Sequence, residues 1–214
     1  MTLSLDDFFK IPRRKRPRQE NDYWSFEPNF FDRKIENDVY NELKPHLGGI
    51  HKRKSCKLME CPETEEIKVL ESTQSVNPNY NYEKIKSASW KDCPTLLKIK
   101  EKLEEFAKCK FDYVLAHEYP DGDAIIAWHF DAEAMNSVIA SVSFFATRDF
   151  VINPIGDKSL KSPDAVRIPL ESGDTLLMKV GMQQKFWHCV PTQHKVKQKR
   201  INLTFRQLEQ PKKE

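Results

Sequence analysis

The segment RINLTFR, residues 200–206, alternates polar and apolar residues near the end of the 214-residue chain. In a β-strand this period of two puts four polar side chains on one face and three apolar ones on the other. They are Arg200, Asn202, Thr204 and Arg206, opposite Ile201, Leu203 and Phe205. Two arginines that face the interior of a β-protein are costly to bury unless anions pair with them. Because an arginine pairs bidentately with a carboxylate, the strand predicts a site for a small dicarboxylate. An amphipathic edge strand with a solvated polar face is the alternative.

The segment AWHFDAEA, residues 127–134, alternates in the same way, with His129, Asp131 and Glu133 at every second position. In a strand these three side chains would share a face. An imidazole and a carboxylate on one side suit Fe(II), which is bound in a facial triad of two histidines and one carboxylate. A solvated strand face fits the same segment when it is considered alone.

The second histidine of such a triad must come from another segment. His188 lies among apolar residues in KFWHCVP, whereas His194 lies in the charged segment TQHKVKQK. We choose His188 as the ligand and expect His194 at the surface. Taken alone, His188 also fits a hydrogen-bonded core histidine.

The spacing of apolar residues predicts two helices followed by strands. Apolar residues recur every fourth position over residues 30–47, and a second helical stripe over residues 92–108 begins with Pro94, which suits a first turn. The two stripes are Phe31, Ile35, Val39 and Leu43, then Leu96, Ile99, Leu103 and Phe106. From Phe111 onward, short alternating runs are separated by turn residues, which is typical of a β-sandwich or barrel.

Composition limits the class of protein. Residues 1–18 carry six basic and two acidic residues, so the net charge of +3 comes from this end and the remainder is near neutral. The polar, basic segment 1–22 is expected to be a disordered tail, and 209–214 a second one. The five cysteines form no C-x-x-C pair, which disfavours a structural zinc site. Since no apolar run approaches the roughly 20 residues of a membrane span, we expect a soluble intracellular protein with no membrane contact.

The order of H-x-D, a distal histidine and RINLTFR resembles the AlkB family of Fe(II)/2-oxoglutarate dioxygenases. The segments IASVSFFATRDF, WHCVP and RINLTFR resemble in particular its DNA-repair branch. The resemblance implies an α+β fold with a double-stranded β-helix (jelly-roll) core over 111–208. Residues 23–110 would supply N-terminal helices and a nucleotide-recognition lid. It also implies oxidative demethylation of N-alkylated DNA bases, of the 1-methyladenine and 3-methylcytosine type. That reaction is coupled to decarboxylation of 2-oxoglutarate to succinate and CO2, with release of formaldehyde.

The resemblance also implies residue roles. His129, Asp131 and His188 would bind Fe(II), with O2 and 2-oxoglutarate as cosubstrates, and Arg200 would pair with the distal carboxylate of 2-oxoglutarate. The other implied cosubstrate contacts are Arg206, Asn202, Thr204, Tyr119 and His117, the last of which stands where the family usually has asparagine.

Four residues are candidates for contacts with the nucleic acid. Glu133 matches an acidic residue that in the family contacts the exocyclic nitrogen of the damaged base. In the lid region, Arg53 could contact a phosphate, and Tyr80 or Tyr82 could stack on a flipped base. A solvated charge run and ordinary loop tyrosines are the alternatives.

The N-terminal segment suggests partners. Leu5, Phe8 and Phe9 resemble a degenerate sliding-clamp (PCNA) binding box, with Thr2 where glutamine is preferred, and PRRKRPR fits a nuclear import signal. We therefore expect a nuclear monomer that acts on methylated single- or double-stranded DNA. Two alternatives stay open: a dioxygenase with the same core acting on RNA or protein, and a non-catalytic clamp-binding nucleic-acid module.

Overall fold

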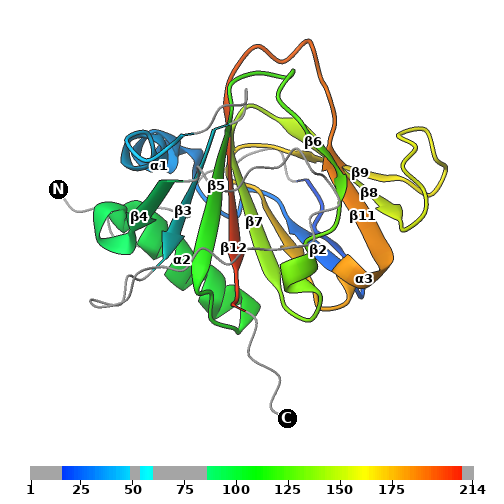
Figure 1. Ribbon diagram of the computed structural model, residues 1–214, viewed down its shortest axis with the longest axis horizontal. Coiled ribbons are helices and arrows are strands. Elements are labelled where there is room, and N and C mark those ends of the chain that lie inside the picture. The colour runs from blue at the N-terminus through cyan, green and yellow to red at the C-terminus, as the bar shows by residue number, and fades with distance from the viewer. Residues whose placement is uncertain (1–15, 49–53, 60–85, 209–214) are drawn as a thin grey trace.

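Two β-sheets face each other in the computed structural model, which describes residues 16–48, 54–59 and 86–208 (Figure 1). The large sheet has the strand order β1-β2-β10-β7-β12-β5-β3-β4, and the small sheet has the order β6-β11-β8-β9. All neighbours pair antiparallel except β3 and β4. This arrangement confirms the predicted jelly-roll class.

The strands of the large sheet are β1 (Gln19–Glu20), β2 (Trp24–Glu27), β3 (Lys54–Met59), β4 (Lys86–Ser89), β5 (Tyr113–Tyr119), β7 (Ile139–Phe145), β10 (Thr175–Met178) and β12 (Arg200–Arg206). Those of the small sheet are β6 (Ile126–His129), β8 (Arg148–Pro154), β9 (Val166–Leu170) and β11 (Phe186–Val190). The α-helices are α1 (Glu36–Leu43), α2 (Pro94–Ala107) and α3 (Met182–Lys185), and the 3-10 turns are η2 (Arg33–Ile35), η4 (Trp90–Asp92) and η5 (Ala132–Ala134). No helix among the described residues is long and apolar enough to span a membrane.

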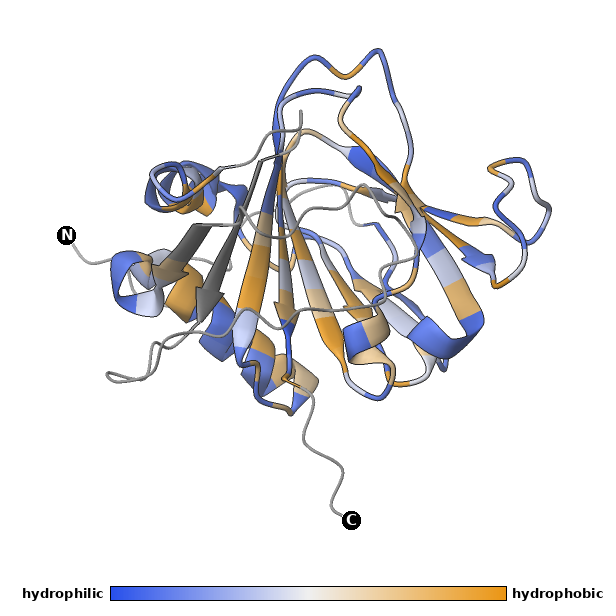
Figure 2. Cartoon of the chain, in the orientation of Figure 1, coloured by the Kyte–Doolittle hydropathy of each residue, from blue (hydrophilic) through white to orange (hydrophobic). Residues whose placement is uncertain are grey.

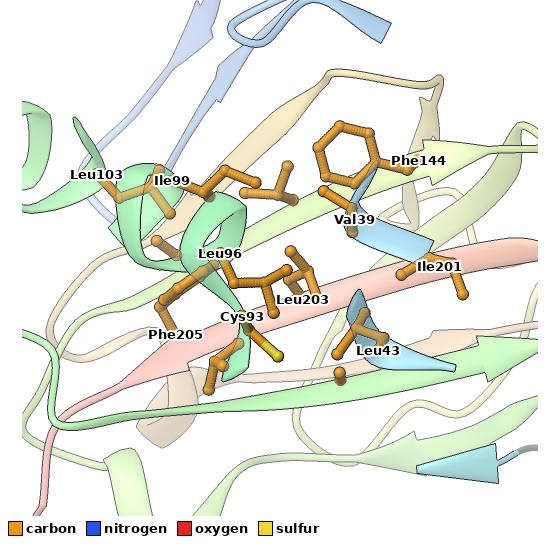
Figure 3. Packing of buried hydrophobic residues seen from close by; sticks show 14 of the residues in the cluster. Val39, Leu43, Cys93, Leu96, Ile99, Leu103, Phe144, Ile201, Leu203 and Phe205 are labelled. Carbon is orange, nitrogen blue, oxygen red and sulfur yellow. The ribbon is translucent and has the colours of Figure 1, made fainter. Parts of the chain in front are cut away.

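Helices α1 and α2 cover the outer face of the large sheet. Their predicted apolar stripes point inward: Val39 and Leu43 from α1, and Leu96, Ile99 and Leu103 from α2, are buried against the sheet (Figure 3). On the sheet side they contact the apolar face of β12, which consists of Ile201, Leu203 and Phe205. Figure 2 shows apolar residues along the strands and polar residues on the outward sides of both helices. The helix periodicity therefore predicts the buried faces correctly.

The first helix begins later than expected. Residues 33–35 form a 3-10 turn, because the Asp32 side chain accepts a hydrogen bond from the backbone N–H of Lys34 at 2.9 Å and caps that turn. Phe31 therefore precedes the helix, although its side chain is buried with the rest of the stripe.

A disordered tail was expected over residues 1–22, but residues 16–22 belong to the folded part of the chain. Strand β1 pairs with β2, and the Arg16 guanidinium binds both carboxylate oxygens of Asp174, at 2.7 and 2.5 Å. Asp174 is fully buried and also accepts backbone N–H groups from Asn29 and Glu171. An unpaired carboxylate at that depth would be costly, so Arg16 belongs to the folded part.

Residues 23–110, which were predicted to supply helices and a lid, also contribute strands to the large sheet. Strand β2 pairs with β10, and β3 pairs with β5, so the large sheet recruits strands from this region on both sides of the core strands. The sequence interpretation missed β2, a four-residue strand whose partner lies far away along the chain. It expected hairpins and loops over residues 48–89, where β3 instead pairs with β5 of the core.

A buried glutamate joins the end of α2 to the start of β5. The Glu104 carboxylate accepts hydrogen bonds from Lys100 at 2.7 Å, Lys110 at 2.8 Å and the backbone N–H of Phe111 at 2.9 Å. Burial alone would raise the pKa of Glu104, but these donors outweigh it and hold the pKa below its ordinary value. The ionised form is therefore favoured by folding.

We expect Glu104→Gln to lower the free energy of unfolding at pH 7 by about 1–3 kcal/mol, because it removes charge-assisted bonds to a buried group. The folded-state pKa is lowered, so this contribution is complete above the pKa of the unfolded chain and is lost as the pH falls through the folded-state pKa. The difference between variant and unsubstituted protein should therefore shrink toward pH 3. Urea unfolding at several pH values measures it. Glu105→Gln, whose side chain is exposed, is the control and should change stability by less than about 0.5 kcal/mol.

Candidate metal centre

Three predicted ligands come together between β6 and β11. His129 ends β6, and His188 lies directly opposite it in the antiparallel pairing of β6 with β11. Asp131 follows β6, and its carboxylate lies 3.4 Å from Nε2 of His188 and 3.8 Å from Nε2 of His129. One ligand atom from each of the three residues falls within 4.8 Å of the others.

The strand predicted through residues 129–133 ends at His129, which corrects the expectation that Glu133 continues the same strand face. Asp131 occupies the N-cap position of η5 without a side-chain hydrogen bond to the turn, and Glu133 lies within that turn. The backbone N–H of Asp131 does not continue the β-ladder, because it donates to the buried side-chain carbonyl of Gln183 at 2.9 Å. Gln183 therefore orients the carboxylate ligand, and the sequence analysis missed it.

The protonation states suit metal binding. Nδ1 of His129 lies 2.8 Å from the carbonyl oxygen of Ala127, so it donates there and Nε2 keeps its lone pair. Burial, with a further contribution from the neighbouring His188, lowers the pKa of His129 to about 4. Burial would raise the pKa of Asp131, but Arg206 and the two histidines hold it well below its ordinary value. The site therefore presents one carboxylate and a neutral His129 at neutral pH.

Arg206 closes one side of this cluster. One of its terminal nitrogens donates to Asp131 Oδ1 at 2.8 Å, and the other pairs with the partly exposed carboxylate of Glu133. Burial opposes the charged form, but these two acids raise the pKa of Arg206. The structure thus brings Arg206, predicted as a cosubstrate contact, together with Glu133, predicted as a base contact.

Arg200, at the other end of β12, is buried and pairs with none of the acids that the structure describes. Its guanidinium donates to the Ser143 hydroxyl at 2.9 Å and lies 5.0 Å from the centre of the Tyr119 ring. Nε and Nη1 have no hydrogen-bond partner among the described residues, and no described carboxylate forms an ion pair with this arginine. Burial lowers the pKa of Arg200. A cation so placed fits an anionic ligand.

The remaining predicted cosubstrate residues lie on adjoining strands. In the pairing of β12 with β5, Arg200 is opposite Tyr119 and Asn202 is opposite His117. All four are buried. The Asn202 amide donates to the Ser141 hydroxyl and to the Val142 carbonyl, each at 2.9 Å, and the Thr204 hydroxyl donates to the Leu115 carbonyl at 3.2 Å. Asn202 and Thr204 thus also stabilise the sheet.

Other predicted residues are placed elsewhere or not at all. His194 has an 81% exposed side chain and pairs with Asp123, as expected for a surface residue. Outside the described residues lie Arg53, Tyr80, Tyr82, Leu5, Phe8 and Phe9. Ser143 was missed, although its alternation with Ser141 on β7 marks a polar face, with Ser143 opposite Asn202 and Ser141 opposite Thr204.

The residues present fit a 2-His-1-carboxylate iron centre beside a dicarboxylate site. The donor set is the one that non-haem Fe(II) takes. Two nitrogens of Arg200 have no partner among the described residues, so they could bind a carboxylate of a ligand. The fit therefore rests on the chain's own ligands and on one buried cation.

Gln183→Ala should weaken metal binding about tenfold, because residues that orient a ligand typically contribute ten- to a hundredfold to metal affinity. Titration of the metal-free protein with Mn(II) or Co(II) measures the dissociation constant. Gln184→Ala is the matched control, since the neighbouring Gln184 is exposed and bonds to Met135 and Asn136 instead. Equal affinities for the two variants would contradict an orienting role for Gln183.

The sequence is similar to curated proteins that are named as a demethylase and a dioxygenase. The chain is 39% identical to human DNA oxidative demethylase ALKBH2 over 122 residues, which cover 54% of this chain and 46% of that protein. It is 36% identical to mouse alpha-ketoglutarate-dependent dioxygenase alkB homolog 3 over 120 residues, 53% of this chain and 42% of that protein. The chain spans about half the length of the curated relatives it matches.

Structure and family comparisons cover more of the chain. The solved structure of OsALKBH1 superposes with a TM-score of 0.56 and 18% identity, over 89% of this chain and all of that one, and it shares the fold. The model of the 2OG-Fe(II) oxygenase superfamily matches residues 25–206, the span from the first residues of β2 to the last residue of β12. With that match and the triad at its centre, the chain belongs to the 2OG-Fe(II) oxygenase superfamily.

Proposed function

We propose that this chain is an Fe(II)/2-oxoglutarate dioxygenase that removes methyl groups from ring nitrogens of DNA bases, in direct-reversal repair. The observation that carries the proposal is the buried Arg200, which pairs with no carboxylate in the described part of the chain, in the same fold as the His129, Asp131 and His188 cluster. The names of the two demethylase and dioxygenase relatives support DNA as the substrate.

His129, Asp131 and His188 would hold the iron, and Arg200 would hold the distal carboxylate of 2-oxoglutarate. Tyr119, His117 and Asn202 would line the same cosubstrate site. When bound, iron would let O2 oxidise both partners: one oxygen atom goes into succinate as 2-oxoglutarate loses CO2, and the other hydroxylates the methyl group, which then leaves as formaldehyde. Every other contribution is positioning and exclusion of water by this chain.

Arg206 and Glu133 would connect the two halves of the site. Arg206 bonds to Oδ1 of Asp131, which leaves Oδ2 directed at His188 and available as a ligand atom. Glu133 is the most exposed member of the cluster, with 44% of its side chain accessible. Its carboxylate can therefore accept a hydrogen bond from an exocyclic amine of a base. A base inside a duplex is unreachable, so the nucleotide must be flipped or single-stranded.

Asp131→Ala should lower the rate of formaldehyde release from an oligonucleotide with 1-methyladenine or 3-methylcytosine by at least about a hundredfold. The substitution removes a proposed metal ligand itself, whereas loss of a residue that orients a ligand typically costs ten- to a hundredfold. The control is Asp164→Ala, an exposed aspartate on the β8–β9 loop, which should keep the full rate. A rate for Asp131→Ala equal to that of the control would contradict the assignment of Asp131 as a metal ligand.

The same assay on methylated single-stranded DNA, duplex DNA, RNA and a methylated peptide decides the substrate class. DNA is expected to react fastest.

We also propose that the N-terminal residues Leu5, Phe8 and Phe9 bind a sliding clamp and that the chain works in the nucleus. A pair of phenylalanines in an otherwise polar stretch of sequence is typical of a docking peptide. Phe8→Ala/Phe9→Ala should reduce clamp binding by about tenfold or more, because a few buried aromatics dominate such interfaces. A pull-down with the purified clamp measures this. Arg13→Ala/Arg14→Ala controls for charge, and a larger loss in this control would contradict aromatic docking.

A further inference from the structure

Arg148, the first residue of β8, is a second buried arginine that the proposed chemistry does not use. Only 1% of its surface is exposed. It forms no ion pair with a described carboxylate, and its donors go to oxygens of two loops. The acceptors are the carbonyls of Asp121 at 2.8 Å, Ala124 at 2.9 Å, Pro191 at 2.8 Å and Gly122 at 3.3 Å, and the side chain of Gln193 at 3.0 Å.

The two loops occupy equivalent places in the fold. Residues 120–125 run from Tyr119 at the end of β5 to β6, which ends at His129. Residues 191–199 run from β11, which carries His188, to Arg200 at the start of β12. Each loop thus joins a metal-ligand strand of the small sheet to a cosubstrate strand of the large sheet, and Arg148 binds both.

The loops are also bound to each other around this arginine. The backbone N–H of Gly122 donates to the Val196 carbonyl at 2.8 Å, and that of Gln193 donates to the Gly122 carbonyl at 2.9 Å. A Cβ at Gly122 would lie 1.8 Å from the Gln193 carbonyl oxygen, so only glycine permits this approach. The His194 side chain adds a contact to Asp123 at 2.5 Å. The arginine therefore lies at the centre of one closely packed junction.

The junction adjoins the anion site through one aromatic ring. The Arg148 guanidinium lies 5.7 Å from the centre of the Tyr119 ring, and the Arg200 guanidinium lies 5.0 Å from the same centre. Displacement of Arg148 would therefore move Tyr119 and the start of β12. A lysine could keep the charge there, but its single ammonium cannot reach acceptors on two loops as a planar fork does.

We propose that Arg148 is a positioning residue that sets the separation between the metal ligands and Arg200, and thereby the length of the keto diacid that the site accepts. The inference rests on the proposed function, because a keto diacid must span these two groups. The proposal predicts that loss of the Arg148 guanidinium changes the ratio of the affinities for diacids of different length. A change that weakens all diacids equally would leave this ratio unaltered.

The test is calorimetric binding of oxaloacetate, 2-oxoglutarate and 2-oxoadipate to the Ni(II)-loaded full chain. The three diacids differ by one methylene each, and a fitted site distinguishes one methylene by roughly tenfold or more. We expect the unsubstituted protein to bind 2-oxoglutarate roughly tenfold more tightly than the other two diacids. In Arg148→Lys, which keeps the charge, the difference should fall to about threefold or less. Arg167→Lys, at an exposed ion pair on β9, is the control and should retain the full preference.

The outcomes separate the inference from the proposed function. Equal weakening of all three diacids by Arg148→Lys, with the preference intact, overturns the positioning role while the proposed function stands. If Arg148→Lys does not fold, Gln193→Ala replaces it, because it removes one acceptor and leaves the arginine in place. An unchanged preference in Gln193→Ala then overturns the inference. Absence of Ni(II)-dependent binding of 2-oxoglutarate to the unsubstituted protein overturns the proposed function and the inference with it.

Discussion

Strand β12 is buried on both faces, and the rest of the structure depends on how its polar face is satisfied. The apolar face packs under α1 and α2, so the strand cannot slip by one residue without exchanging its faces. The polar face turns toward the inside of the fold, where each donor needs a partner within the protein. Asn202 and Thr204 find partners on β7 and β5, which binds the centre of the sheet together.

Local periodicity was enough to predict this layer. The alternation of residues 200–206 predicts an apolar face and a polar face, and the structure packs the apolar one against the helices. The helical stripe Leu96, Ile99 and Leu103 predicts the buried side of α2, and the structure agrees. The choice of His188 over His194 depended only on neighbouring residues, apolar in one case and charged in the other. It also agrees, because one side chain is buried and the other exposed. What such patterns cannot report is the element that lies against a given face.

The errors follow from that limit. Residues 129–133 alternate like a strand, but the chain turns after His129 because the N–H of Asp131 bonds to Gln183, 52 positions away. The sequence around Arg16 predicts a charged tail, because its partner Asp174 lies 158 positions away along the chain. Arg148 likewise gives no local sign that it is buried. Each of these contacts joins segments whose proximity arises only from the sheet topology.

The two arginines of β12 differ in whether a described residue supplies an acid for them. Both are buried, yet Arg206 binds Asp131 and Glu133, which raise its pKa, while Arg200 has a hydroxyl and an aromatic ring and its pKa is lowered. A buried cation paired with acids is complete within the fold. One without an acid is tolerated because the surrounding strands hold it, and its free nitrogens gain most from a carboxylate ligand. The proposed function therefore assigns the anion site to the Arg200 end, while Arg206 binds the carboxylate of Asp131, a proposed metal ligand.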